Sequence, residues 1–191
     1  MRNASTTASA ASAALAALSH PTRLRILVAL FDAHDRGEPA RLDAMAVAVG
    51  LDVRLLSKEI VRLTEAGLIT REQGRLAPDP GHLATLSDDL VETTALCRAI
   101  PPTSPLRRYL AHGRVTVLPK RPDDLSAVAA ALASLLPDDR ELTEPEVNAH
   151  LAEAGPDTAA LRRLLVDLGF LTRQGAAHYR RVIPTHEHTV A

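Results

Sequence analysis

Apolar residues recur at helical spacing through the first part of the chain. The small, polar residues 1–8 predict a disordered tail, and the alanine-rich residues 9–18 predict a helix. A break at residues 19–21 separates it from a second predicted helix over residues 22–31. The apolar side chains of this second helix are spaced to face a core: Leu24, Leu27, Val28 and Phe31.

Two further helices with a short turn between them are predicted next. Residues 42–49 predict a short helix, residues 50–52 a tight turn that contains Gly50, and residues 53–66 another helix that Asp52 is placed to cap. A helix, a three-residue turn with a glycine and a second helix form the helix-turn-helix arrangement.

The helix over residues 53–66 has two contrasting faces when its side chains are placed about 100° apart. The apolar face comprises Leu56, Ile60 and Leu63. The basic face lies nearly opposite and comprises Arg54, Lys58 and Arg62. Glu59 is nearer the core, where we expect it to support a partner arginine rather than to contact a base.

A small β-hairpin is predicted after this helix. Gly67 ends the helix, residues 68–71 and 75–77 predict two strands, and residues 72–74 predict the turn between them. A charged helix face is usually just solvated, but its position after a helix-turn-helix turn favours contact with DNA. Arginine, lysine and hydroxyl side chains bind phosphates and base edges. The predicted DNA-contacting residues are Arg54, Ser57, Lys58, Arg62, Arg71 and Arg75.

The clearest break in the chain is rich in proline. Residues 83–100 predict one helix, and the prolines within residues 101–105 lack the backbone donor that a helix needs, which predicts a linker. Beyond the linker, residues 114–118 predict a strand. Thr143 and Glu146 have the spacing of a capping box at the start of a helix.

Part of the first half recurs at an offset of 102 residues. Residues 63–71 align with residues 165–173, and each copy is followed by a turn and a second strand. Two copies of one unit predict a mainly α fold with small β-hairpin wings, arranged as tandem winged helix-turn-helix domains. The predicted division is a tail at 1–8, a first domain at 9–100, a linker at 101–105, a second domain at 106–183 and a tail at 184–191.

Composition limits the classes of function. The net charge is −1, so a nucleic-acid surface has to be a local arrangement of side chains. Aromatic residues make up 2% of the chain, which argues against stacking of unpaired bases. The single cysteine, Cys97, fits a reducing compartment. We see no apolar run of membrane-spanning length and no leader peptide, and therefore expect a cytoplasmic protein with no membrane contact.

Three segments carry a resemblance to a known family. ALSHPTRLRIL at residues 17–27, Gly50-Leu51, and LTEAGLI at residues 63–69 resemble the opening signature, turn and wing entry of the arsenical-resistance repressor (ArsR) type of winged-helix regulators. The resemblance implies a bacterial transcription repressor that binds duplex DNA as a homodimer. Its dimer interface would use residues 8–18 and 83–100, and would set two recognition helices about 34 Å apart.

The second half resembles a domain of unknown function that follows such heads in some bacterial regulators. The resemblance is carried by LPKR at residues 118–121, TEPEVN at residues 143–148 and LRRLLVD at residues 161–167. It implies no activity for this half, and the sequence does not identify an effector.

The chain departs from the metal-sensing members of the ArsR family. Residues 42–49 lack the paired cysteines of those members, and residues 87–100 contain no histidine, so we expect no metal and no cofactor. A tail explains His186 and His188 more simply than a metal site that His178 would join. No set of side chains typical of catalysis is present, and we expect the protein not to be an enzyme.

Two questions stay open at the level of sequence. Six basic residues could form another phosphate-binding surface in the second half, unless they pair with Asp123, Asp124 and Asp167: Lys120, Arg121, Arg162, Arg163, Arg180 and Arg181. A ligand pocket or a protein contact surface is equally consistent with that half. For the whole chain, the alternative is a tandem winged-helix interaction module that organises a protein complex without direct DNA contact. RNA binding ranks third.

Overall fold

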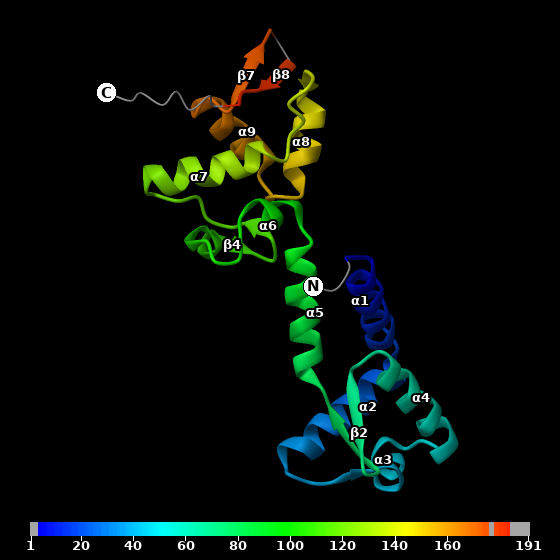
Figure 1. Cartoon of the computed structure of the whole chain (residues 1–191). Helices are drawn as coiled ribbons and strands as arrows, with labels where there is room; N and C mark the ends of the chain where they lie inside the picture. The colour runs from blue at the N-terminus through cyan, green and yellow to red at the C-terminus, as the bar shows by residue number, and fades with distance from the viewer. Residues whose placement is uncertain (1–3, 176–177, 184–191) are drawn as a thin grey trace. The chain divides into compact units, whose positions relative to one another are not determined.

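The fold is mainly helical, with small antiparallel hairpins that follow helices, as the sequence predicts for tandem winged-helix-like units. The computed structural model describes residues 4–175 and 178–183. The chain divides into two compact units between Leu90 and Val91. Figure 1 shows the hairpin β2–β3 in the first unit and the hairpin β7–β8 in the second.

The first unit is built from helices that pack on one small sheet. Its elements are α1 Ala4–Leu18, α2 Pro21–Asp35, β1 Ala40–Arg41, α3 Leu42–Val49, α4 Val53–Glu65, β2 Ile69–Glu72, β3 Arg75–Pro78 and α5 Pro80–Glu92. The strands are antiparallel in the order β1-β3-β2. The largest buried side chains of its core are Ile26, Leu30, Leu56, Leu63 and Ile69.

Two features of the first unit differ from the sequence prediction. The first helix begins at Ala4, so residues 4–8 are helical rather than part of a tail, and Thr7 is buried. Residues 5–7 are serine and threonines of lower intrinsic helix propensity than alanine, so the burial of Thr7 against the rest of the unit, and not propensity, explains the extension. In α2 the core is formed by Ile26, Leu27, Leu30 and Ala33, whereas three residues of the predicted core stripe are exposed: Leu24, Val28 and Phe31.

The second unit repeats this plan with additional short elements before it. Its elements are α6 Ala95–Ala99, the 3-10 helix η1 Pro105–Tyr109, β4 Leu110–Ala111, β5 Arg114–Val115, α7 Pro122–Ala133, β6 Leu142–Thr143, α8 Glu144–Ala152, α9 Thr158–Asp167, β7 Leu171–Gln174 and β8 His178–Arg181. The predicted strand over residues 114–118 is therefore only two residues long. The capping box between Thr143 and Glu146 is confirmed at the start of α8.

The sequence repeat is also a structural repeat. With the offset of 102 residues, β1 falls on β6 and β2 falls on β7, and the sheet orders β1-β3-β2 and β6-β8-β7 correspond. The copies differ in the hairpin, where the second has one more residue between its strands than the first. The order of pairing in the two sheets therefore supports the two-unit plan that the local sequence match predicts.

The boundary between the units lies before the proline-rich segment rather than in it. The predicted helix over residues 83–100 is two helices, because Thr94 starts α6 by accepting a hydrogen bond from the Cys97 backbone N–H. Leu96 and Ile100 are buried in the core of the second unit. Residues 95–100 therefore belong to the second unit. The sequence prediction, which placed them in the first domain, is wrong at this point.

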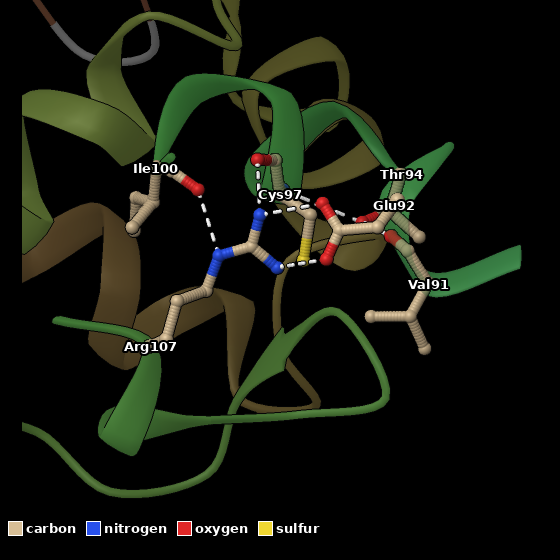
Figure 2. Close-up of polar contacts among 6 residues, drawn as sticks. All are labelled: Val91, Glu92, Thr94, Cys97, Ile100 and Arg107. Carbon is tan, nitrogen blue, oxygen red and sulfur yellow. Dashed lines mark hydrogen bonds and ion pairs between the residues drawn. The ribbon is translucent and has the colours of Figure 1, made fainter. Parts of the chain in front are cut away.

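The segment predicted as a linker is anchored by Arg107 (Figure 2). Its Nε donates to the Ile100 carbonyl at 2.7 Å and its Nη2 donates to the Cys97 carbonyl at 2.7 Å. Nη1 and Nη2 each donate to a different carboxylate oxygen of Glu92 at 2.8 Å. These bonds connect the residues before and after residues 101–105, so the prolines form a fixed connection inside the second unit.

The helices are short relative to the thickness of a bilayer. Helices α1 and α2 have 15 residues each, whereas about 20 are needed to span the hydrocarbon core. No single helix among the described residues is long and apolar enough to cross a membrane, and α1 and α2 reach that length and composition only as a pair bent by 91°.

Candidate nucleic-acid interface

The turn between α3 and α4 has the geometry that the sequence predicts for a helix-turn-helix. Gly50 adopts the left-handed conformation with φ of 66°, which L side chains rarely adopt, and it ends α3. Asp52 caps α4, where its carboxylate accepts hydrogen bonds from the backbone N–H groups of Arg54 at 2.8 Å and Leu55 at 3.3 Å. The start of α4 is therefore fixed by local interactions.

The outward face of α4 carries the three predicted cations. Arg54, Lys58 and Arg62 are exposed, and no ion pair to an acidic side chain is recorded for them within residues 4–175 and 178–183. The opposite face is buried and comprises Leu56, Ile60 and Leu63. This arrangement leaves three positive charges on consecutive turns available to a polyanion, while the core fixes the helix behind them.

Ser57 is less accessible to a ligand than the three cations of α4. Its side chain is half-buried, and its hydroxyl donates to the Val53 carbonyl at 2.8 Å. The hydroxyl hydrogen is thus used within the helix, so Ser57 can offer an acceptor to a ligand but no donor to a phosphate.

Glu59 lies on the inner flank of α4 and binds Arg23 of α2. The prediction that it supports an arginine is confirmed, because Arg23 Nε lies 2.8 Å from Glu59 Oε2 and both side chains are nearly buried. The hydrogen bond from Arg23 holds the pKa of the Glu59 carboxyl below its ordinary value, against the opposing effect of burial. Arg23 also donates to the Ala16 carbonyl at 3.2 Å, so one guanidinium joins α4 to α1 and α2.

The two arginines of the wing lie on opposite faces of the hairpin. Gln73 and Gly74 both have positive φ, which is typical of a two-residue hairpin turn. Arg71 pairs with Leu76, and Arg75 pairs with Glu72. Directly opposed residues share a face and successive residues alternate, so Arg71 is on the face of the buried Leu76 and Arg75 is on the other face.

Arg41 is a basic residue of the wing that the sequence analysis missed. It is exposed, and the sheet register places it directly opposite Arg75. The two arginines therefore share the outer face of the sheet. Strand β1 has only two residues, which is too short for an alternating pattern to reveal it.

Arg162 of the predicted second basic surface is bound within the second unit. Its Nη1 donates to the Asn148 side-chain oxygen, and its Nη2 lies 2.8 Å from Glu144 Oε1. The guanidinium carbon lies 5.7 Å from the centre of the Tyr179 ring. The side chain is 13% exposed, so Arg162 holds α8, α9 and β8 together and is not free for a phosphate.

The other members of the predicted second basic surface differ in exposure, and Arg181 among them is bound like Arg162. Arg181 donates to the Leu136 carbonyl at 2.9 Å and lies 4.0 Å from Asp138. The acidic partners of Arg162 and Arg181 are thus Glu144 and Asp138, whereas Asp124, which the sequence suggested, has its pKa lowered in part by the charge of Arg121. Four members remain exposed: Lys120, Arg121, Arg163 and Arg180.

The repeat shows that the second unit lacks the cationic face of α4. The offset of 102 residues places Pro156, Ala160 and Leu164 at the positions of Arg54, Lys58 and Arg62. The corresponding helix α9 therefore cannot offer the same three charges. Of the two units, only the first therefore carries this three-cation face on the helix that follows the turn.

Potential metal ligands are scattered over the described part of the chain. Within residues 4–175 and 178–183, no three histidine, cysteine, aspartate or glutamate side chains are grouped so that they could hold a metal ion. His178 is exposed on β8, whereas His186 and His188 lie outside the described residues. Cys97 has a free thiol and is buried.

Comparison with known proteins identifies part of the second unit. Residues 114–181 match the model of a family described as uncharacterized proteins conserved in bacteria, DUF2087. This part of the second unit is therefore similar to the DUF2087 family. The description assigns no activity, in agreement with the predicted resemblance of residues 106–183 to a domain of unknown function. No curated protein and no solved structure matches the chain.

Proposed function

We propose that the chain is a transcriptional regulator that binds duplex operator DNA through α4 and the β2–β3 wing. The observation that carries the proposal is the exposed face of Arg54, Lys58 and Arg62 on the second helix of a helix-turn-helix. The major groove of B-DNA admits an α-helix, and arginine and lysine bind both its phosphates and its guanine edges. The ArsR-like segments of residues 17–69 support the same proposal.

The proposed regulator acts as a homodimer. Helix α1 exposes Leu15, and α5 exposes Leu83. Exposed leucines on these two helices support the dimer contact that the family resemblance implies. A dimer would present two copies of α4 to a two-fold symmetric operator.

Fluorescence anisotropy with a labelled duplex from the chain's own promoter tests the proposal. We expect the triple variant R54A/K58A/R62A to weaken binding by about tenfold or more, equivalent to about 1.4 kcal/mol. The slope of log K against log salt should fall by about 0.9 for each phosphate that the variant no longer neutralises. The matched control R36A/R98A/R140A removes the same charge from exposed arginines elsewhere and should bind as the wild type does.

A triple variant of α4 that binds as tightly as the wild type would contradict the proposal. It would favour the alternative, a tandem winged-helix module that organises a protein complex without direct DNA contact. Helix α9 lacks the cationic face, which supports a protein-binding role for the second unit within the proposed regulator. A preference for structured RNA over duplex DNA in the same assay would instead favour RNA binding.

A further inference from the structure

One face of α2 is apolar but exposed, and the proposed DNA contact does not use it. Leu24, Val28 and Phe31 are 42%, 59% and 38% exposed. Residues three and four apart lie on the same side of a helix, so the three side chains form one stripe. The residues that join α2 to the core lie on its other side.

Helix α3 extends this stripe into a wider apolar surface. Helices α2 and α3 pack against each other within the first unit, and Ala48 and Val49 of α3 border the stripe. A shallow depression between the two helices is lined by Leu24, Arg25, Val28, Ala29, Asp32, Ala48 and Val49. Contiguous apolar patches on soluble proteins commonly mark interaction sites.

Two opposite charges border the depression at nearly equal distances from Val28. Arg25 precedes Val28 by three residues and Asp32 follows it by four, and both side chains are exposed. No ion pair is recorded for either of them within the part of the chain that the structure describes. They lie two turns apart on the same flank of α2, next to the apolar stripe.

We propose that this surface binds the same surface of a second copy of the chain. The two α2 helices run antiparallel, related by a two-fold axis that passes near Val28. A two-fold axis of this kind keeps both flanks on the same side and reverses their order. Arg25 then meets the partner's Asp32 while Asp32 meets the partner's Arg25, and the apolar stripes cover each other.

The charge pattern is what selects a second copy as the occupant. A helix with one positive and one negative flanking residue, placed symmetrically about its apolar centre, is complementary to itself when antiparallel. Specificity of this kind arises because a parallel two-fold arrangement would place the charged flanks of the two copies on opposite sides of the interface, where Arg25 and Asp32 could not pair. The contact is independent of DNA binding, and it uses helices other than the α1 and α5 of the proposed regulatory dimer.

Site-specific cross-linking of the full-length protein tests the proposal. Val28→Cys places a thiol beside the proposed axis, and a short bis-maleimide should link two copies of this variant. Val117→Cys, at a 62% exposed valine of the second unit, is the matched control and should link about tenfold less. The wild-type chain reports any contribution of the buried Cys97.

Charge reversal in the Val28→Cys background distinguishes this contact from any other self-association. R25D or D32R alone should each reduce the cross-linked fraction about fivefold or more, because like charges then face each other, and R25D/D32R together should restore it. Equal linking of Val28→Cys and Val117→Cys would overturn the proposal and leave the surface to a different partner. If the cross-linked fraction of R25D/D32R were no higher than that of the single variants, the antiparallel pairing would be overturned.

Discussion

Arg23 and Glu59 form an ion pair that fixes α4 from behind, with Arg23 Nε 2.8 Å from Glu59 Oε2. The side chains are 11% and 9% exposed, so neither charge is well solvated. Glu59 stands one position after Lys58, about 100° round the helix, and lies on the inner flank of α4 rather than on the exposed basic face. The pair therefore fixes the position of α4 against α2, whereas the outward cations carry the proposed DNA contact.

Replacing Glu59 by glutamine should destabilise the first unit. Arg23 would keep a hydrogen-bond acceptor but lose the compensating charge, at a cost of about 1.5 to 3 kcal/mol. Urea unfolding followed by circular dichroism measures the change. The control is Glu65→Gln at an exposed position of the same helix, which should change the free energy of unfolding by less than about 0.5 kcal/mol. Equal effects of the two substitutions would show that the buried pair contributes no more than a surface charge.

Gly67 and Gly169 provide a matched pair of substitutions at the ends of α4 and α9. Both have positive φ, 71° and 76°, so alanine should cost roughly 1 to 2 kcal/mol in backbone conformation at either site. A Cβ on Gly67 would also clash with the His82 ring, whereas Gly169 has nothing within 4 Å. We expect G67A to lower the free energy of unfolding more than G169A. The double variant G67A/H82A should remove the difference, and a G67A effect that persists there would show that His82 is not its cause.

Arg107 should be more important for the second unit than its neighbour Arg108. Arg107→Ala removes donors to Glu92 and to the Cys97 and Ile100 carbonyls, and the side chain is 18% exposed. Arg108 forms an exposed ion pair with Asp124, and exposed pairs contribute little to stability. Hydrogen exchange of residues 94–100 should therefore accelerate in R107A and stay near the wild-type rate in R108A. Unchanged exchange in R107A would show that the proline-rich connection is held by packing alone.

Local sequence patterns predicted the first unit well because its elements begin and end at strong signals. Asp52, Gly50 and Gly67 mark helix ends through capping and positive φ, and these features depend on neighbouring residues only. The role of Glu59 also followed from its angular position on α4. The six predicted DNA-contacting residues lie on α4, β2 and β3, although strand alternation separates Arg71 from Arg75.

The errors arose where tertiary packing decides between two local possibilities. Leu24 and Val28 have helical spacing with Leu27, yet the core takes Leu27 and leaves the other two exposed. The prolines of residues 101–105 suggested a linker between two domains, but Arg107 binds carbonyls on the N-terminal side of that segment and so joins its two ends. A charge pattern alone likewise could not show that Arg162 is enclosed by Glu144 and Asn148, because those contacts join separate helices.

The capping box of α8 predicts a specific dependence of stability on pH. The Thr143 backbone N–H and hydroxyl donate to Glu146 Oε2, and Arg140 donates to Oε1. The backbone hydrogen bond from Thr143 is the largest cause that lowers the pKa of Glu146 from 4.5 to about 2. The folded-state pKa lies below the unfolded one, so this stabilisation is present above about pH 4.5 and is lost as the pH falls toward 2.

An NMR titration of the Glu146 carboxyl measures that midpoint directly. We also expect the difference in unfolding free energy between the wild type and Glu146→Gln to be constant above about pH 4.5 and to shrink toward pH 2. A titration midpoint near 4.5 would show that the capping box does not persist in solution.

The wing leads to a prediction that separates its two faces and depends on the proposed DNA contact. If the outer face meets a phosphate, R75A and R41A should each weaken binding to all duplexes and lower the salt slope by about 0.9 for each phosphate left without its cation. R71A tests the inner face in the same assay, and R36A, at an exposed arginine ion-paired with Glu38, is the control. Arg41 and Arg75 share a face, so R41A and R75A should act alike whichever side of the wing contacts DNA. A weaker affinity in R71A alone would place the DNA backbone against the face that carries Leu76, and would exclude Arg41 from the interface.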